Sequence, residues 1–537
     1  MSGLENPGTA SPHGSYSTTS HELLLLSNKM KLLDCTLRDG GYYTNWDFDD
    51  SVVCSYIRAM NALPVDYLEL GYRSMPSGEY LGKFGYTPVS VLKGIRRQCS
   101  KKLAVMLNEK DTRPEHLPEL IGPIVGLADM IRIALDPGNF DRALALARAV
   151  KGMGFEVGFN TMYMSKWHDY EGFLDKLDLL DGVADVFCMV DSFGGATPED
   201  IKDTFAAVRG RTACPIGFHG HNNLQMGLAN TLAAIRCGAD FVDATVLGMG
   251  RGAGNLNTEL LLTCLAKRGL DVDFNVLGEA VETFKALYEE HRWGTILPYM
   301  ISGAYSIPQK EVMAWVGNRA YSFNSIVRAL DNRRNRVADN ARYPVLNAEK
   351  ARQVLIVGGG ESVREHISAI SEFLQNNTEM RIIFATARHA RLFTGLANGK
   401  AYCLVGNEAR RLKSLVSAAE FKGICVLPPY PRTMGTEVPG YAEDKTFELR
   451  GITFTESFLD SCTTAALECA VEYGADEVYV VGYDGYRGAV LSEKEADLTN
   501  ENRALFDDFK ARTGKEIISL VPTLYKSLKV MSIYQFL

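Results

Sequence analysis

Two histidines, His219 and His221, stand two residues apart at the end of a short apolar run. Alternation along a β-strand would place both imidazoles on one side, where they could bind a single metal ion. The pair alone is equally compatible with histidines of the surface or the core. However, an earlier apolar run leads into Arg38 and Asp39, and a later glycine-rich turn ends in Asn255. Three polar clusters, each just beyond an apolar run, indicate one metal site.

The elements that must position these residues follow a regular pattern. From residue 30 to residue 244, short apolar runs alternate with longer amphipathic segments, which is typical of repeated βα units around a parallel sheet. Eight strands are predicted, over Lys31–Cys35, Tyr67–Leu70, Leu103–Leu107, Met130–Ala134, Glu156–Phe159, Val186–Val190, Ile216–His219 and Phe241–Ala244. Eight such units predict a closed (β/α)8 TIM barrel with its chemistry at the carboxyl ends of the strands.

In such a barrel, the three polar clusters follow strands one, seven and eight, which become neighbours on closure. Adjacent strands lie about 4.8 Å apart, so side chains from these three ends could share one ion. The other strand ends are polar as well and would line the same mouth, with Glu69, Arg73, Asn108, Arg132, Asn160, Asp191 and Ser192.

Composition excludes several classes of protein. With 46% hydrophobic and 23% charged residues and a net charge of −8, the 537-residue chain does not resemble a general nucleic-acid or membrane-surface binder. Its 11 cysteines contain no CxxC pair, which fits a reducing compartment. The apolar run 23–26 is too short for a signal or membrane helix. We expect a cytoplasmic protein.

The chain is too long for one ordinary core, so two folded domains are expected. Residues 1–28, rich in Ser, Thr and Gly, predict a disordered tail, and residues 29–270 the barrel domain. Residues 271–335 predict a helical extension of the barrel and a polar linker beginning with Asp331–Arg336. Residues 345–537 predict a Rossmann-like, doubly wound α/β domain.

In this second domain, the predicted strand Arg352–Val357 runs into a glycine turn and a helix. The turn residues are Gly358, Gly359, Gly360, Glu361 and Ser362. They form either a nucleotide site or a simple turn that closes a βα unit, because the GxGxxG pattern is incomplete. Further strands are predicted over Arg381–Ala385, Ile424–Leu427, Glu477–Val481 and Glu516–Leu520.

Residues 30 to about 310 resemble the HMG-CoA lyase-like family of metal-dependent aldolases and Claisen-condensing enzymes, which carry an Arg-Asp motif on the first barrel strand and HxH on the seventh. The runs TLRDG (36–40), GFHGHNNL (217–224) and AGN (253–255) are most similar to 4-hydroxy-2-oxovalerate aldolases. The resemblance implies Asp39, His219 and His221 as metal ligands, with Asn255 as a fourth. Such oxygen and imidazole ligands suit Mn²⁺ or Mg²⁺, with Co²⁺ and Zn²⁺ as further candidates.

The same resemblance implies catalytic roles. Arg38 would hold the enolate oxygen formed when a carbon–carbon bond of a 2-oxo acid breaks. The aldolases have a histidine where this chain has Tyr42, and a tyrosine with the ordinary pKa near 10 is a weak base. The 4-hydroxyl proton could instead pass to a hydroxide on the metal, to His168 or to Glu69. Tyr305 matches a tyrosine that assists proton transfer to the enolate carbon, or is a packed aromatic.

The leading hypothesis is therefore a divalent-metal-dependent aldolase that cleaves or forms a 4-hydroxy-2-oxo acid, with pyruvate as one product and an aldehyde as the other. One alternative is a Claisen-type synthase of an acyl-CoA and a 2-oxo acid, which the AGN turn and Glu259 would also allow. Another is a catalytically silent barrel with a nucleotide-binding second domain. The resemblance also implies a homodimer.

Residues 358–362, Asp460–Leu467 and Tyr479–Gly485 are weakly similar to Rossmann-like domains of MptE-like pterin pyrophosphokinases and some bacterial sialyltransferases. This similarity implies that Gly358 to Ser362 and Asp484 face a nucleotide or a nucleotide-sugar. The alternative is a structural α/β domain whose glycines serve its turns.

Overall fold

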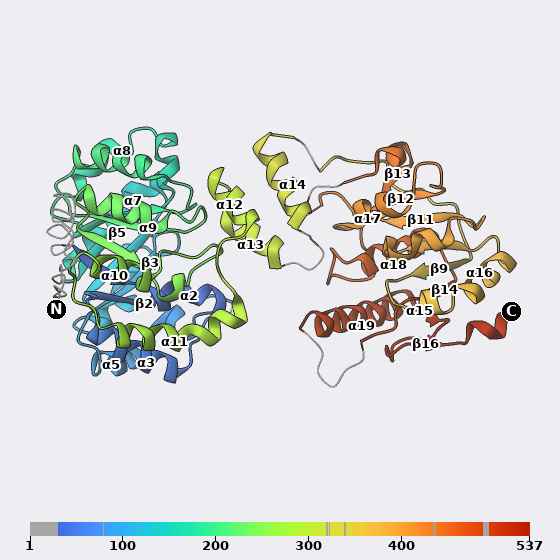
Figure 1. Ribbon diagram of the computed structural model, residues 1–537, viewed down its shortest axis with the longest axis horizontal. Coiled ribbons are helices and arrows are strands. Elements are labelled where there is room, and N and C mark those ends of the chain that lie inside the picture. The colour runs from blue at the N-terminus through green and yellow to red at the C-terminus, as the bar shows by residue number, and fades with distance from the viewer. Residues whose placement is uncertain are drawn as a thin grey trace, which may run out of the picture. The chain divides into compact units, whose positions relative to one another are not determined.

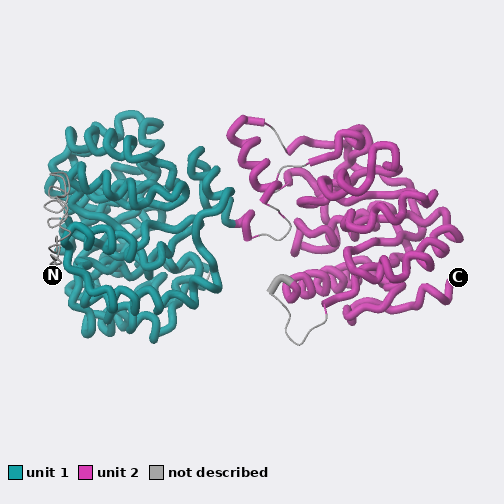
Figure 2. Tube along the Cα trace, viewed as in Figure 1, with its two compact units in different colours: residues 1–313 teal, residues 314–537 magenta. Residues whose placement is uncertain are grey.

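The computed structural model describes residues 30–486 and 493–537, except 79, 318–320, 322, 338–339, 433 and 435–436. The predicted tail, residues 1–28, lies outside the described residues. The chain divides into two compact units, Met1–Met313 and Ala314–Leu537 (Figure 2).

Unit 1 is built on a closed barrel of eight parallel strands, as predicted (Figure 1). The strands are β1 Lys31–Asp34, β2 Tyr67–Tyr72, β3 Lys102–Asn108, β4 Met130–Leu135, β5 Glu156–Thr161, β6 Val186–Asp191, β7 Ile216–Gly220 and β8 Phe241–Ala244. Every predicted strand is present, and its ends lie within two residues of the prediction. Pairing of β8 with β1 closes the barrel, which places the ends of β7, β8 and β1 side by side.

Helices surround the barrel and cover its outer face. They include α3 Asp50–Ala62, α5 Val89–Arg96, α7 Phe140–Gly152, α8 Pro198–Arg209, α9 Gly227–Arg236, α10 Thr258–Ala266 and α11 Phe274–His291. All residues of β2 and β6 are buried, because each strand packs on helices outside and on other strands' side chains inside. This double burial explains why the strands read as continuous apolar runs.

Three more helices follow the barrel: α12 Leu297–Ala304, α13 Gln309–Gly317 and α14 Phe323–Arg334. The predicted polar linker at residue 331 begins too early, because Asp331 to Arg334 form the last turn of α14. The packing of Ile326 and Leu330, both buried, stabilises this helix through its polar end.

Unit 2 contains one open sheet of eight parallel strands in the order β13-β12-β11-β10-β9-β14-β15-β16. The strands are β9 Gln353–Val357, β10 Arg381–Phe384, β11 Lys400–Cys403, β12 Ile424–Leu427, β13 Thr446–Glu448, β14 Glu477–Val481, β15 Ile517–Ser519 and β16 Lys529–Val530. The order runs outward from β9 in one direction and from β14 in the other. The point of reversal lies between these two central strands, which confirms the doubly wound Rossmann-like class.

Helices cover both faces of this sheet (Figure 1). Alternate strand residues pack on α18 Cys462–Glu472 and α19 Glu493–Thr513 on one face. The other residues pack on α16 Ile367–Asn376 and α17 Glu408–Leu415. Three strands, β11, β13 and β16, were not predicted, because they are only two to four residues long and carry little apolar pattern.

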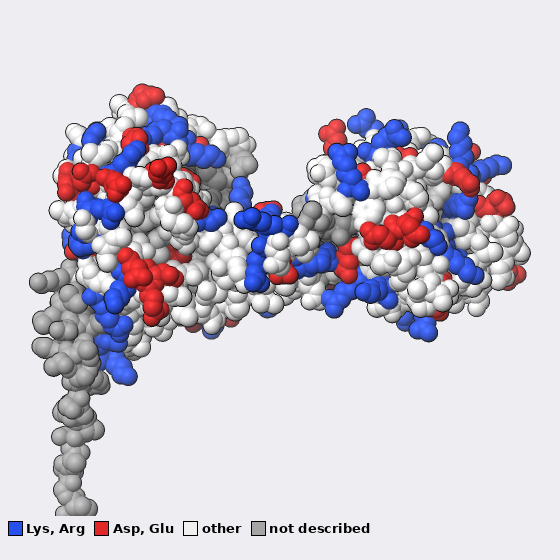
Figure 3. All heavy atoms as spheres, turned by 90° about the horizontal axis from the view of Figure 1, so that it is seen from above, with Lys and Arg blue, Asp and Glu red and all other residues white. Residues whose placement is uncertain are grey.

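Charged side chains of both signs are interspersed over the face of each unit seen in Figure 3. The net charge of −8 is therefore not gathered into one acidic patch on that face. Within the described part of the chain, no helix is both long and apolar enough to cross a membrane.

Candidate metal centre and active site

The four predicted metal ligands lie together at the carboxyl end of the barrel. The His219 and His221 rings have centroids 4.9 Å apart. His219 Nε2 lies 3.6 Å from Asp39 Oδ2, and the Asn255 amide donates a 2.6 Å hydrogen bond to the same oxygen. The backbone of Asn255 also forms a β-bridge with His221. All four side chains are buried, so the site is shielded from bulk water.

Asp39 reaches this cluster from a short helix rather than from a strand end. The Asp34 carboxylate accepts a 3.0 Å hydrogen bond from the Thr36 amide, which ends β1 and begins α2 Thr36–Thr44. Gly40 lets α2 approach the glycine-rich turn closely, since a Cβ there would lie 2.4 Å from Met249 Sδ. The Arg-Asp motif was therefore assigned to the first strand incorrectly, because the hydrogen bond from the Thr36 amide to Asp34 turns the chain out of the strand and a helix begins there.

The two histidines are oriented by bonds at Nδ1. His219 Nδ1 lies 2.9 Å from Asp243 Oδ2, and His221 Nδ1 lies 2.9 Å from the Asp191 carbonyl oxygen. A carbonyl only accepts, so His221 carries its proton on Nδ1 and leaves Nε2 as a lone-pair donor. An outer partner at Nδ1 is the usual arrangement behind a metal-binding imidazole.

The protonation states favour a cation. Burial alone would raise the pKa of Asp39, but Arg38 and the two histidines hold it below its ordinary value. Burial, with His219 nearby, lowers the pKa of His221 to about 3. The carboxylate is therefore charged and this imidazole neutral, the forms in which both groups bind metals.

The donor set fits a divalent metal ion. The Asn255 Oδ1 atom is buried and, among the described residues, has no hydrogen-bond partner. It joins the Asp39 carboxylate and two imidazole nitrogens, a mixture that suits Mn²⁺, Mg²⁺, Co²⁺ or Zn²⁺.

A second grouping, Cys35, His219 and Asp243, has ligand atoms within 4.8 Å of one another. Burial and the nearby Asp39 raise the pKa of the Cys35 thiol well above its usual range, so it stays protonated. Asp243 already accepts from Arg132 at 2.6 Å and contacts His219 Nδ1. We therefore assign Asp243 the role of orienting His219, and not that of a ligand.

Arg38 is held beside the cluster by two carboxylates. Its Nε donates a 2.8 Å hydrogen bond to Glu69 Oε2, and its Nη1 contacts Asp39. Glu69 Oε2 also accepts from Arg132 at 3.0 Å. A buried chain of ion pairs thus runs from Arg38 through Glu69 and Arg132 to Asp243.

This arrangement argues against Glu69 as the catalytic base. The Glu69 carboxylate is completely buried, and its Oε2 is already bound by both Arg38 and Arg132. The structure instead makes Glu69 a positioning partner of Arg38. His168, the other candidate base, lies on η4 Met164–Asp169 with a side chain that is 78% exposed, and its Nε2 is 3.1 Å from Asp169 Oδ1.

Tyr42 lies on α2 at the edge of the site. Its hydroxyl is 3.4 Å from that of Tyr72, and its ring meets the ring of Trp46 edge-on at 5.0 Å. Tyr72 is buried near Arg38, and burial raises the pKa of its hydroxyl well above the ordinary value. The tyrosine pair therefore extends from Arg38 toward solvent.

Tyr305, directly after α12, is 44% exposed. Its helix packs over the barrel mouth, since the Asn223 amide donates a 2.9 Å hydrogen bond to the Tyr299 carbonyl. The next residue, Ser306, lies 3.0 Å from Ser165 in the segment after β5, hydroxyl to hydroxyl. Tyr305 is thus at the rim and not in the buried ligand cluster.

Glu259, which the synthase alternative invoked, has a structural role. Its carboxylate accepts hydrogen bonds from the Leu247 amide at 3.0 Å and from Asn257 Nδ2 at 2.9 Å. These bonds tie the glycine-rich turn to the start of α10, so the carboxylate is engaged within its own loop.

Three site residues were missed as functional candidates: Asp243, Tyr72 and Arg251. A charged residue inside the four-residue apolar strand β8 was a usable signal for Asp243. Tyr72 extends β2 beyond its predicted end. Arg251, within the glycine-rich turn, had no distinguishing local pattern.

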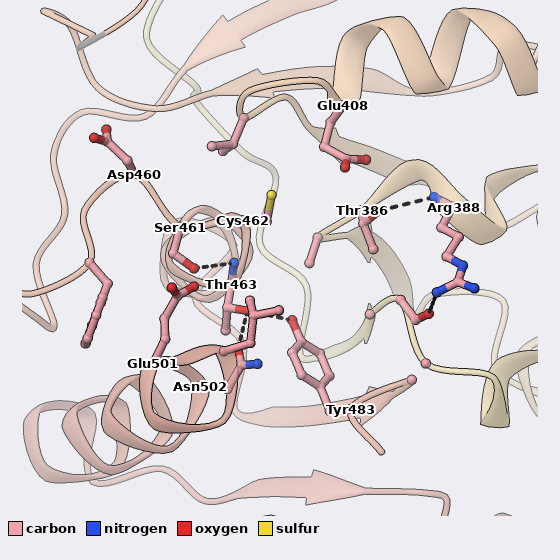
Figure 4. Close-up of a pocket in the computed structure, with 18 of the residues that line it drawn as sticks. Thr386, Arg388, Glu408, Asp460, Ser461, Cys462, Thr463, Tyr483, Glu501 and Asn502 are labelled. Carbon is pink, nitrogen blue, oxygen red and sulfur yellow. Dashed lines mark hydrogen bonds between the residues drawn. The ribbon is translucent and has the colours of Figure 1, made fainter. Parts of the chain in front are cut away.

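Unit 2 has a separate cavity of about 930 Å³ at the carboxyl edge of its sheet (Figure 4). Its walls come from the segments after β9, β10, β11 and β14 and from the starts of α18 and α19. Among the predicted nucleotide-site residues, the cavity is lined by Gly358, Gly359, Gly360, Glu361 and Asp484.

The glycine turn itself is explained by packing. A Cβ on Gly360 would lie 2.4 Å from Asp484 Oδ2, and one on Gly358 would lie 2.5 Å from the Gly482 carbonyl oxygen. Asp484 accepts a 3.0 Å hydrogen bond from the Ser362 amide and caps the four-residue helix α15 Ser362–Glu365. A carboxylate thus occupies the place where a phosphate was expected.

The opposite wall carries a polar network. Ser461 caps α18 by accepting from the Thr463 amide at 3.1 Å, and the Thr463 hydroxyl donates to Asn502 Oδ1 at 2.7 Å (Figure 4).

Two arginines also line the cavity. Arg388, about half exposed, pairs with Glu361 at 2.6 Å. Arg411 also lines the cavity and pairs with Glu408.

Comparisons with known proteins agree with the barrel site. The HMGL-like family model matches residues 138–282. The chain is 32% identical over 244 residues to the oxaloacetate decarboxylase of Mycobacterium tuberculosis H37Rv, covering 44% of this chain and 70% of that protein. It is 30% identical over 259 residues to the 4-hydroxy-2-oxovalerate aldolase of Carboxydothermus hydrogenoformans, covering 46% of this chain and 73% of that protein.

Among solved structures, the N-terminal domain of an aldolase candidate from Bacteroides vulgatus is 65% identical, with a TM-score of 0.54. The match covers 56% of this chain and all of that one. The fold and the site together define a parallel (β/α)8 barrel with a buried donor set at its carboxyl end that fits a divalent metal ion. The chain belongs to the HMGL-like family, and membership supports carbon–carbon lyase chemistry at the level of the family.

Proposed function

We propose that this protein is a divalent-metal-dependent aldolase that cleaves or forms a 4-hydroxy-2-oxo acid, with pyruvate as one product of cleavage. The observation that carries the proposal is the buried cluster of Asp39, His219, His221 and Asn255 beside Arg38. Relatives named 4-hydroxy-2-oxovalerate aldolase support the substrate class. The presence of all four donor side chains in one cluster argues against the alternative of a catalytically silent barrel.

Each residue has a defined task in this proposal. Asp39, His219, His221 and Asn255 would hold the ion, which when bound would supply Lewis-acid stabilisation of charge on a 2-oxo group. Arg38, fixed by Glu69 and Asp39, directs its remaining N–H groups to the enolate oxygen.

Proton transfer completes the reaction. In cleavage, the 4-hydroxyl loses its proton as the C3–C4 bond breaks, the aldehyde leaves, and C3 of the enolate takes a proton to give pyruvate. We assign Tyr42 to accept the proton of the substrate's 4-hydroxyl group. The Tyr42 hydroxyl lies next to that of Tyr72, on the path from Arg38 toward the barrel mouth. Tyr305, at the rim, is assigned to the proton delivered to C3.

The test is pyruvate release from a panel of 4-hydroxy-2-oxo acids after chelator treatment, with and without Mn²⁺ or Mg²⁺. We expect metal-dependent release that Asp39→Ala abolishes. Asp141→Ala, which removes an exposed carboxylate on α7, is the matched control and should leave the rate unchanged. No release with any metal, together with turnover of an acyl-CoA, would replace this proposal by the Claisen-type synthase.

A second function is proposed for unit 2: its cavity binds a nucleotide or a nucleotide-sugar. The position at the switch point of a doubly wound sheet is where such folds bind ligands. Arg388 and Arg411 in the cavity wall are paired with Glu361 and Glu408 and retain further N–H donors that a phosphate could accept, while the glycine turn packs against Asp484.

This second proposal is tested by thermal shift of the full chain with nucleoside triphosphates and nucleotide-sugars. Gly359→Phe should abolish any shift, because a Cβ at Gly359 meets nothing closer than 3.4 Å and the side chain can fill the cavity. Gly395→Phe, at an open surface position, is the control. A panel without any shift would leave unit 2 with a structural role.

A further inference from the structure

The glycine-rich turn after β8 presents one long side chain, Arg251, whose structural role is unexplained. A Cβ on Gly250 would lie 2.5 Å from the Asn255 amide nitrogen, and one on Gly254 would lie 2.3 Å from the carbonyl oxygen of the turn's first glycine. Met249 is completely buried against α2. The glycines thus fix the path of the turn, Met249 anchors it, and Arg251 remains on the side that faces α2.

The guanidinium carbon of Arg251 lies 5.5 Å from the ring centroid of Tyr42. The side chain is half-buried and, among the described residues, forms no ion pair, whereas Arg38 and Arg132 each contact two carboxylates. A partly desolvated guanidinium without a counter-ion is unfavourable unless a ligand supplies one.

Arg251 also lies close enough to the metal centre for its charge to act on a residue there. Its charge interacts with the imidazole of His221. From Arg38 outward, Tyr72 and then Tyr42 lead to Arg251 along one side of the mouth. The part of a substrate that extends beyond its reacting carbon would leave the site along this side.

We propose that Arg251 binds a second anionic group, a carboxylate or a phosphate, on the aldehyde half of the substrate. This inference rests on the proposed aldolase function, in which the first carboxylate and the 2-oxo group lie at the metal. A guanidinium presents several N–H donors in one plane and can bind such an anion through two hydrogen bonds. The face of Tyr42 restrains the plane of the group through a cation–π contact.

Condensation of pyruvate with different aldehydes tests the inference. In this reaction the pyruvate methyl group loses a proton, its carbon bonds to the aldehyde carbon, and the resulting alkoxide is protonated. The Mn²⁺-loaded full chain is assayed with propanal, succinic semialdehyde and glycolaldehyde phosphate, which carry no anion, a carboxylate and a phosphate. We compare kcat/KM of the parent protein, Arg251→Gln and Arg251→Lys. Arg58→Gln on the exposed face of α3 is the control.

We expect an anionic aldehyde to be preferred and Arg251→Gln to lower its kcat/KM by about a hundredfold, a size typical of a lost charge-assisted contact. The rate with propanal should change by no more than a few-fold, and Arg251→Lys should recover part of the loss. The better of the two anionic aldehydes identifies the group as carboxylate or phosphate. Equal losses with propanal and the anionic aldehydes, or no loss at all, would overturn the inference.

A binding measurement separates this inference from the proposed function. Calorimetry with 2-oxoadipate and 2-oxohexanoate compares ligands of equal chain length that differ in a second carboxylate. Preference for 2-oxoadipate that disappears in Arg251→Gln supports the anion site, even if no aldehyde is turned over and the aldolase proposal fails. Equal affinity of the parent protein for both ligands, together with turnover of propanal alone, refutes the anion site and leaves the aldolase proposal standing.

Discussion

Replacing Asp243 by asparagine should weaken metal binding although Asp243 is not a ligand. Its Oδ2 contacts His219 Nδ1 at 2.9 Å and accepts from Arg132 at 2.6 Å. Burial alone would raise the pKa of Asp243, but Arg132 and His219 lower it to about 2, so a full negative charge is lost on substitution.

The magnitude follows from these two contacts. A hydrogen bond to a charged group contributes about 1.5–3 kcal/mol, and outer partners of metal-binding histidines contribute about 10–100-fold in metal affinity. Asparagine keeps one acceptor oxygen for His219, so we expect the lower part of that range, about 10–30-fold. Arg132 keeps its ion pair with Glu69 at 3.0 Å, which limits the loss of stability to about 1–3 kcal/mol.

The assay is the dissociation constant of Mn²⁺, measured by electron paramagnetic resonance of free Mn²⁺ after chelator treatment, alongside thermal unfolding. Asp240→Asn, directly before the same strand, is the matched control because its carboxylate contacts Arg209 and the Ile216 amide instead. An Mn²⁺ dissociation constant within twofold of the parent value for Asp243→Asn, or an equal weakening by Asp240→Asn, would refute the reasoning.

Three further outcomes are expected. Tyr42→Phe should lower kcat for pyruvate release by about a hundredfold or more, the size of an acid–base contribution, while Tyr80→Phe at an exposed site changes nothing. Gly360→Ala should lower the unfolding free energy by about 1–3 kcal/mol in denaturant titrations, because its Cβ would lie 2.4 Å from Asp484, whereas Gly440→Ala meets no atom within 4 Å. His389 is almost fully buried, and burial lowers its pKa in the folded protein. Below pH about 6.5 the unfolded chain therefore binds a proton at this histidine that the folded protein does not bind, so the free energy of unfolding decreases as the pH is lowered. His389→Phe should remove up to about 1 kcal/mol of the stability loss between pH 6.5 and 5.5, and Gly440→Ala, which changes no titratable group, should remove none; equal pH dependence in all three proteins would contradict the assignment.

The barrel was predictable because each of its strands is a compact apolar run followed by a polar residue. The last two residues of β2, Gly71 and Tyr72, were not predicted as strand, because their local sequence is typical of a loop. A Cβ on Gly71 would lie 2.0 Å from the Phe84 carbonyl oxygen. The glycine therefore serves a close approach of a distant segment, and local pattern does not contain that information.

Among the site residues, spacing and resemblance led to Asp39, His219, His221 and Asn255, which the structure places in one cluster. The role of Asp243 depends on the register of β7 and β8, in which Gly217 pairs with Phe241. That register brings a carboxylate beside an imidazole 24 positions away, and it is set by barrel closure and not by nearby sequence. The candidate bases Glu69 and His168 stay predictions; the burial of Glu69 between two arginines and the exposure of His168 are tertiary properties that local sequence does not contain.

The electrostatic balance of the centre gives an independent reason to expect a cation there. The buried chain contains three carboxylates, Asp39, Glu69 and Asp243, but only two guanidinium groups, Arg38 and Arg132. Uncompensated charge in a low-dielectric interior is costly, and loss of one ion-pair partner there typically costs several kcal/mol. A divalent ion between Asp39 and the two histidines would offset the excess negative charge as well as activate a substrate. Metal binding and stability of the barrel should therefore be coupled, which is why the Asp243 experiment measures both.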